Sequence, residues 1–247
     1  MLPGDDIAWS GSYTFSGVGS AASQFYTYKT DGLFQSQEEV NNYVDGEGNM
    51  IQPNAKPGDV KYVDADGNGT IDSNDITEVG SPLPSIEYGL NIGLTYKAFD
   101  MSMFFQGVAG NEILNVNRYE MEAANSGYNV SSKLTNAWTP TNTNTDIPRN
   151  VIEDNNNNYM MSDRYLENGS YFRLKNIQIG YTLPQSVLNK IKVERLRIYV
   201  NADNVFTITD YNGYDPEVVP VNALTQGVDH GNYPMYKTFT AGVQLTF

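Results

Sequence analysis

The sequence has no cysteine and a single histidine, His230. The absence of cysteine excludes a disulfide framework and a thiolate metal site. A lone histidine disfavours both a Ser-His-Asp triad and a histidine-rich metal site, and no pair of carboxylates has a spacing that suggests hydrolysis. We therefore expect that the chain is not an enzyme.

Long hydrophobic runs are also missing, because no segment approaches the ~18 consecutive apolar residues of a membrane helix. The start, "MLPGDDIAWSG", lacks the charged and apolar regions of a signal peptide. Basic residues are few, 15 against 29 acidic ones, and the net charge of −14 argues against binding to nucleic acid or to anionic lipid surfaces. A mean hydropathy of −0.45 does not exclude membrane strands, since only alternate residues of such strands face lipid.

What the sequence does have is alternation of apolar and polar residues, which predicts β-strands with one apolar face. In "IEYGLNIGLTY" every second residue from Tyr88 to Tyr96 is apolar, and after Lys97 and Ala98 the alternation resumes at Phe99. This pattern predicts a hairpin with a tight turn. Five or six strands are expected in all, and the clearest cover residues 85–96, 99–107, 170–182, 195–206 and 236–247.

The opposite faces of these strands are rich in Gly, Thr and Asn, residues that a watery lumen tolerates. Within 170–182 the apolar residues change parity between Leu174 and Ile177. A β-bulge near Lys175 and Asn176 would restore a single apolar face, because it inserts one extra residue into the strand.

The connections between the predicted strands alternate in length. Turns at 97–98 and 183–193 are short, whereas the polar stretches 36–84, 108–168 and 208–235 are long. This asymmetry, with apolar alternation over ~9–11 residues, is typical of outer-membrane barrels. A β-sandwich with one sheet face in its core is the alternative. Aromatic residues beside the short turns favour the barrel, as members of an interfacial girdle: Tyr96, Phe99, Tyr181 and Phe247.

The stretch "VDADGNGTIDSND" (63–75) crowds four aspartates into one short segment. Hard oxygen ligands at every second residue follow the D-x-[DN]-x-[DN]-G pattern of calcium loops, with Gly69 at the sharp turn and Ile71 as an inward hydrophobic anchor. The predicted metal ligands are Asp64, Asp66, Asn68, the Thr70 carbonyl, Asp72 and Asp75.

The proposed ion is a structural Ca²⁺ that neutralises the carboxylates and fixes a long loop with no core of its own. Position twelve of the loop is Asp75 rather than a bidentate glutamate, and no EF-hand helices flank it. We therefore expect a modest affinity of ~10⁻⁴–10⁻³ M, as in extracellular modules. The alternative interpretation is a solvated acidic turn.

Several longer stretches resemble the C-terminal part of SusC/RagA-type TonB-dependent outer-membrane transporters. The resemblance spans nearly the whole chain in the expected order. Its most specific elements are "YKTDGLFQSQEEV" (28–40), the segment from "PGDVKYVDADGNGTID" to "FFQGVAGNEI" (57–113), "AWTPTNTNTDIPR" (137–149), "SDRYLENGSYFRLKNIQIGYTLP" (162–184), "LRIYVNADNVFTITDYNGYDPEV" (196–218) and the ending "GVQLTF".

This resemblance implies an all-β fold: antiparallel transmembrane strands from the C-terminal part of a 22-stranded barrel, with long extracellular loops. It implies TonB-dependent import of oligosaccharides or peptides across the outer membrane of a Gram-negative, Bacteroidetes-like bacterium. A SusD-like surface lipoprotein would be the partner, TonB would act through an N-terminal part, and Phe247 would be the aromatic read by the barrel-assembly machinery.

Residues 1–247 contain nothing that resembles a plug domain, a TonB box or a signal peptide, so we expect a portion of a larger barrel that does not transport alone. The direction of the strands then makes the turns at 97–98 and 183–193 periplasmic and the long stretches extracellular. A secreted calcium-dependent carbohydrate-binding β-sandwich and an adhesin-like surface protein are the rival hypotheses.

Other residues offer weaker hypotheses. Arg195 and Arg197 are expected to face the lumen near the periplasmic end. There they would either touch a plug domain or, as we favour, pair with carboxylates such as Glu194 or Asp203. The segment "GYDPEV" (213–218) suggests a turn or a second cation site. Aromatic residues in the stretch 108–168 suggest either stacking on sugar rings or packing within the loop and against the lid protein: Trp138, Tyr119, Tyr128, Tyr159 and Tyr165.

Overall fold

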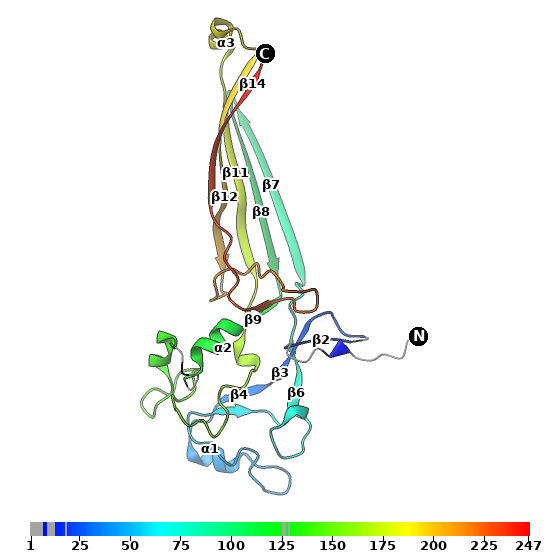
Figure 1. Ribbon diagram of the computed structural model, residues 1–247, viewed down its shortest axis with the longest axis vertical. Helices are drawn as coiled ribbons and strands as arrows, with labels where there is room; N and C mark the ends of the chain where they lie inside the picture. Colours follow the sequence, from blue (N-terminus) through cyan, green and yellow to red (C-terminus); the bar gives the residue numbers. More distant parts are fainter. Residues whose placement is uncertain (1–6, 9–12, 18, 125–126, 128) are drawn as a thin grey trace. The chain divides into compact units, whose positions relative to one another are not determined.

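The computed structural model describes residues 7–8, 13–17, 19–124, 127 and 129–247 (Figure 1). The chain forms two compact units. Each unit is built from segments that are far apart in the sequence. Unit 1 is Met1–Leu83, Glu112–Glu167 and Val218–Asn232, and unit 2 is Pro84–Asn111, Asn168–Glu217 and Tyr233–Phe247.

Unit 2 is one antiparallel sheet of five long strands in the order β14-β12-β11-β8-β7, which lie side by side in Figure 1. All five predicted strands are confirmed, and β12 runs three residues further than the alternation indicated. The strands are β7 (Ile86–Tyr96), β8 (Phe99–Ala109), β11 (Tyr171–Thr182), β12 (Arg195–Thr209) and β14 (Thr238–Thr246).

The two short connections of unit 2 have distinct local causes. The β7–β8 turn has Lys97 in the left-handed region, with φ of 55°, and this permits a two-residue hairpin. The β11–β12 connection contains helix α3 (Gln185–Ile191). Helix α3 ends at Lys192, also left-handed, whose N–H donates to the carbonyl of Leu188.

The register of the sheet places the apolar residues of all five strands on one face, because directly opposed residues of antiparallel strands share a face. A register shift between Leu174 and Asn176 confirms the predicted bulge and brings both halves of β11 onto that face. Three apolar rows cross the sheet: Ile92–Met103–Ile177–Ala202–Phe239, Leu94–Met101–Ile179–Val200–Ala241 and Tyr96–Phe99–Tyr181–Ile198–Val243.

This apolar face is exposed. Leu94 is 55% accessible, Val200 54% and Phe239 74%. The four clusters of buried hydrophobic residues in the described part of the chain all lie in unit 1. A β-sandwich would bury the apolar face against a second sheet. The observed sheet has no such cover among the described residues, which counts against the sandwich.

In its described residues, unit 1 contains three small sheets and short helices, built mostly from the long polar stretches. Its sheets are β1 (Ile7–Ala8), β2 (Thr14–Ser16), β3 (Gln24–Tyr28) and β6 (Ile76–Gly80); β9 (Glu112–Asn115), β10 (Leu166–Asn168) and β13 (Val228–Asp229); and β4 (Thr30–Leu33) with β5 (Val60–Tyr62). Its helices are α1 (Gln37–Asn42), α2 (Val116–Glu122), η1 (Ser73–Asp75), η2 (Ser132–Asn136) and η3 (Asp163–Tyr165).

The expectation that the long loop carrying the aspartates has no core of its own is wrong. Four clusters of buried apolar side chains hold unit 1 together, and the largest joins residues from three separate stretches of the chain. Alternation could not reveal them because each stretch supplies only a few apolar residues. The largest cluster comprises Phe25, Leu114, Val116, Met161, Tyr165 and Val228.

No helix in the described part of the chain is both long enough and apolar enough to span a membrane.

Candidate functional site

The aspartate-rich segment lies in unit 1, between β5 and β6. Its backbone turns at Gly67 and Gly69, which have φ of 76° and 85°, values that favour glycine. A Cβ at Gly69 would also lie 2.8 Å from the Oδ2 atom of Asp45. The sixth loop position is thus occupied by the one residue type that fits, as the calcium pattern requires.

Three of the six predicted ligands converge. Carboxylate oxygens of Asp64, Asp66 and Asp75 all lie within 4.8 Å of one another. Asn68 joins them through its Nδ2 atom, which lies 3.0 Å from Asp66 Oδ2 and 3.3 Å from Asp72 Oδ2. The first three predicted ligands, Asp64, Asp66 and Asn68, and the last, Asp75, therefore lie around one small volume.

Asp72 has a different role from its neighbours. It caps η1, with its side chain accepting from the N–H of Asn74 at 2.7 Å. The Asp75 carboxylate closes the capping box by accepting from the N–H of Asp72 at 2.7 Å. Thr70 donates its side-chain hydroxyl to Asn68 Oδ1 at 2.7 Å, so both residues shape the loop through the protein's own contacts.

The charges of this cluster have no basic partner: within the described residues none of its carboxylates forms an ion pair with Lys or Arg. Asp75 is fully buried, and backbone N–H groups, including that of Ala65 at 2.7 Å, are its donors. Two like charges 4.8 Å apart repel by roughly 3 kcal/mol at an effective dielectric constant of ~20. An all-oxygen group of this kind suits a hard cation such as Ca²⁺.

The aspartate loop is held in place by hydrophobic packing of one of its side chains. Ile71 packs against the buried cluster of Leu33, Val60, Tyr62 and Trp138, which confirms its predicted inward direction. The Tyr43 hydroxyl donates to the Tyr62 carbonyl at 2.6 Å, and burial raises the pKa of Tyr43. The aspartate cluster thus lies next to a packed hydrophobic cluster.

The aromatic residues beside the short turns of unit 2 form a band at one end of the apolar face. Tyr96, Phe99 and Tyr181 occupy one row of the sheet, and the Phe99 and Tyr181 rings are 4.7 Å apart. The Lys97 ammonium lies 5.2 Å from the centroid of the Tyr96 ring. Phe247 is 83% exposed. This band has the composition of an interfacial girdle.

Comparisons with known proteins point in one direction. The chain is 39% identical over 235 residues to TonB-dependent receptor P3 of Formosa agariphila, an alignment that covers 93% of the chain and 22% of the relative. It is 29% identical to TonB-dependent receptor SusC of Bacteroides thetaiotaomicron over 93% of the chain and 20% of the relative. No protein-family model matches the sequence.

The fold agrees. The structure of the RagAB peptide importer in its closed-closed state superposes with a TM-score of 0.71 and 26% identity, covering 98% of this chain and 25% of that one. The chain belongs to the TonB-dependent receptors of the SusC/RagA type. It spans about a fifth to a quarter of the length of these relatives.

This assignment confirms the all-β fold class, since the SusC/RagA-type chain is built of antiparallel strands that match barrel proteins. The relatives are named as receptors and importers, in agreement with the prediction that the chain is not an enzyme.

The aromatic candidates of this SusC/RagA-type chain are mostly internal. Trp138 and Tyr159 are 7% accessible and Tyr165 is fully buried. Tyr119 is half-buried and packs edge-on against Tyr165 with ring centroids 5.3 Å apart. Burial leaves little ring surface for a sugar and favours the packing interpretation. Tyr128 lies outside the described residues.

The arginine pairing expected at the polar face is corrected by the structure. Arg197 pairs with Asp100 on β8, not with Glu194 or Asp203, and it also donates to Gln178 at 2.9 Å. The partner lies 97 positions away in the sequence, so only the register of the sheet brings it near.

The contacts of the "GYDPEV" segment favour the turn over a second cation site. Asp215 accepts from Arg173 Nη2 at 2.6 Å, Glu217 pairs with the other amino group of Arg173, and Lys175 Nζ lies 2.8 Å from Glu217. Arg173 is almost fully buried. Two basic side chains of β11 already neutralise these carboxylates and fix the segment to the polar face of the sheet.

A buried polar network in unit 1 had no signal in the sequence. Asp59 is fully buried and accepts from Arg149 Nη2 at 3.1 Å and from Asn158 Nδ2 at 2.8 Å. Asn158 in turn accepts from the N–H of Val60 at 2.7 Å. These partners lie about 90–100 residues apart, and together they tie the stretch 108–168 to the stretch 36–84.

Proposed function

We propose that this chain supplies five membrane-spanning strands and an extracellular domain to an outer-membrane nutrient importer of a Gram-negative, Bacteroidetes-like bacterium. The observation that carries the proposal is the in-register apolar face of unit 2, which is exposed along five strands. In water such a face would be an aggregation site, whereas hydrocarbon accommodates it.

The strand lengths support the same conclusion. The strands of unit 2 have nine to fifteen residues, and a tilted transmembrane strand needs ~9–11. Among the described residues, the edge strands β7 and β14 each pair with a single neighbouring strand. Because lipid does not tolerate unpaired strand edges, these edges would pair with further strands of a closed barrel, for which we propose the 22-stranded architecture of the resembled family.

The names of the relatives support a proposal for partners and cargo. RagAB is named as a peptide importer. We propose import of peptides or oligosaccharides by this receptor, with a SusD-like surface lipoprotein on the extracellular side and energy from TonB through an N-terminal part. Assembly into the outer membrane would use Phe247 as the aromatic signal. The turns at 97–98 and 183–193 would be periplasmic and unit 1 extracellular.

The absence of cysteine allows a direct test in the intact receptor. Single cysteines at Leu94 and Thr95 lie on opposite faces of β7. We expect a bilayer-soluble maleimide to label Leu94→Cys and a water-soluble one to label Thr95→Cys. Equal labelling of both by the water-soluble reagent would refute the membrane strands.

The same strategy tests orientation. An impermeant maleimide added to whole cells should label Asn144→Cys, in an exposed part of unit 1, but should leave Ala98→Cys unlabelled until the outer membrane is opened. Labelling of Ala98→Cys in intact cells would reverse the proposed topology. Uptake of labelled peptide and oligosaccharide by the same cells then identifies the cargo class.

We also propose that the aspartate cluster binds a structural Ca²⁺. The convergence of three carboxylates without a basic partner among the described residues, and the fit of Gly69, support this. The ion would hold the β5–β6 connection on the core of unit 1. Calcium titration of the intact receptor by calorimetry, against Asp64→Ala and Asp66→Ala, tests it; heat changes equal in wild type and variants would reject the site.

A further inference from the structure

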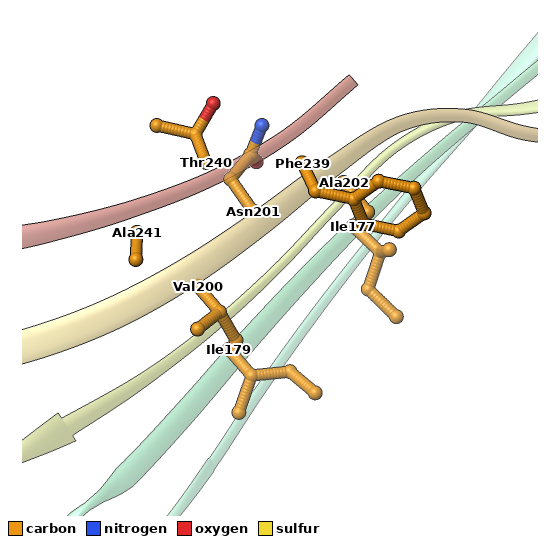
Figure 2. A pocket seen from close by; sticks show the side chains of 8 residues that line it. All are labelled: Ile177, Ile179, Val200, Asn201, Ala202, Phe239, Thr240 and Ala241. Carbon is orange, nitrogen blue, oxygen red and sulfur yellow. The ribbon is translucent and has the colours of Figure 1, made fainter. Parts of the chain in front are cut away.

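The apolar face of unit 2 has a depression in its surface. A depression of about 360 Å³ lies over β11, β12 and β14. Its floor is made by two small residues, Ala202 and Ala241, which lie in adjacent rows of the sheet. Figure 2 shows the side chains of Ile177, Ile179 and Val200 beside it, while Asn201 and Thr240 point to the other side of the sheet.

The wall of this depression is apolar and accessible. Phe239 is 74% exposed and Ile179 is 42% exposed. The small residues create a hollow between larger ones, and a hollow on a lipid-facing surface is filled by hydrocarbon because empty space forfeits dispersion contacts. A flexible acyl chain can follow such a hollow.

The position of the depression along the strands places it within one leaflet of the membrane. Ala202 lies four residues along β12 from Ile198, which belongs to the row of girdle aromatics. At ~3.3 Å per residue and a strand tilt of ~40°, this places Ala202 about 10 Å inside the girdle. Half of a ~30 Å hydrocarbon core is ~15 Å, so the depression lies within the leaflet next to the short turns.

The short-turn end of the sheet is basic, although the chain as a whole is acidic. Lys97, Lys190 and Lys192 lie in the two short connections, and Glu194, the residue after the second connection, is acidic. Lys190 and Lys192 are exposed on and just after α3. The net charge of −14 therefore does not describe this end, which complements an anionic headgroup.

We propose that an anionic phospholipid binds here, with its phosphate among these basic side chains and one acyl chain in the depression over Ala202 and Ala241. The inference rests on the proposal that unit 2 spans a membrane. The depression and the basic side chains both belong to unit 2. The depression lies about as far from these side chains as the acyl chain of a phospholipid lies from its own headgroup. Such a lipid would be held in the periplasmic leaflet.

Native mass spectrometry of the intact receptor in detergent, with added phosphatidylglycerol or phosphatidylcholine, tests the site. Wild type should retain phosphatidylglycerol in preference to phosphatidylcholine. The double variant A202L/A241L fills the groove and should reduce retention by roughly tenfold, since several methylene contacts are lost. Val243→Leu adds a methylene to the same face outside the groove and should retain the lipid.

Charge reversal provides a variant outside the membrane strands. K190E/K192E should weaken phosphatidylglycerol retention by roughly thirtyfold without affecting phosphatidylcholine, whereas Lys133→Glu, an exposed lysine of unit 1, should change nothing. Equal retention of the two lipids, or undiminished retention in A202L/A241L, would overturn the proposal. Labelling of Leu94→Cys by the bilayer-soluble maleimide separates these results from a failure of unit 2 to span the membrane.

Discussion

Calcium should lower the equilibrium constant for local opening of the aspartate loop by an amount that can be calculated. For an ion that binds only the closed loop, the opening equilibrium falls by the factor 1 + [Ca²⁺]/Kd. With 2 mM free Ca²⁺ and a Kd of ~10⁻⁴–10⁻³ M, this factor is about 3–20, or roughly 0.6–1.8 kcal/mol. Amide hydrogen exchange reports such local opening directly.

The assay is hydrogen exchange of the intact receptor in EDTA and in 2 mM Ca²⁺, measured over residues 64–75. The carboxylates of Asp64, Asp66 and Asp75, within 4.8 Å of one another, repel in EDTA and are neutralised by the ion. Exchange of this segment should therefore be about 3–20 times slower with calcium, while the strands of unit 2 should be unaffected.

The variant Asp66→Asn distinguishes an ion site from a solvated turn, because its protection from exchange relative to wild type should differ between EDTA and calcium. Asp66 is exposed and accepts from the backbone N–H of Asn68 at 3.0 Å, a bond that an asparagine oxygen can retain. The variant should match or slightly exceed the protection of wild type in EDTA, because repulsion falls, and should lose most of the calcium effect. Glu153→Gln removes an exposed carboxylate elsewhere in unit 1 and should behave as wild type. Identical exchange of the wild-type loop in both buffers would refute the reasoning.

The remaining predictions concern the membrane face, the unit 1 core and its backbone. Ile179→Arg should destabilise the folded barrel by about 2–4 kcal/mol in urea titrations from vesicles, whereas Thr240→Arg, at an exposed position of the polar face, should cost far less. Burial raises the pKa of Tyr165 to about 12. The neutral Tyr165 side chain therefore contributes its full stabilisation below pH ~10, and this stabilisation is lost as the pH rises toward ~12. Tyr165→Phe should flatten this alkaline loss of stability, and it should be neutral or stabilising at pH 7 because it removes a buried hydroxyl without a partner among the described residues. Gly58→Ala should destabilise unit 1 by roughly 2 kcal/mol or more in thermal unfolding, because φ is 88° and the new Cβ would lie 2.3 Å from Trp138; an unchanged midpoint would show that the Trp138 ring can move.

The sequence by itself determined the sheet of unit 2. A strand repeats every two residues, so alternation from Tyr88 to Tyr96 fixes both the element and its faces without knowledge of neighbours. The same local rule located the hairpin at Lys97, and a parity change located the bulge at Lys175. The aspartate loop was also local, since its ligands lie within a dozen positions.

Only the tertiary structure decided what distant segments do together. The core of unit 1 joins Phe25, Tyr165 and Val228, and the carboxylate partner of Arg197 is Asp100 rather than a neighbour in sequence. No local pattern encodes such pairs, because contacts between residues about a hundred or more positions apart depend on how the chain returns on itself. The exposure of the apolar face was likewise a tertiary fact: alternation looks the same whether that face meets a second sheet or hydrocarbon.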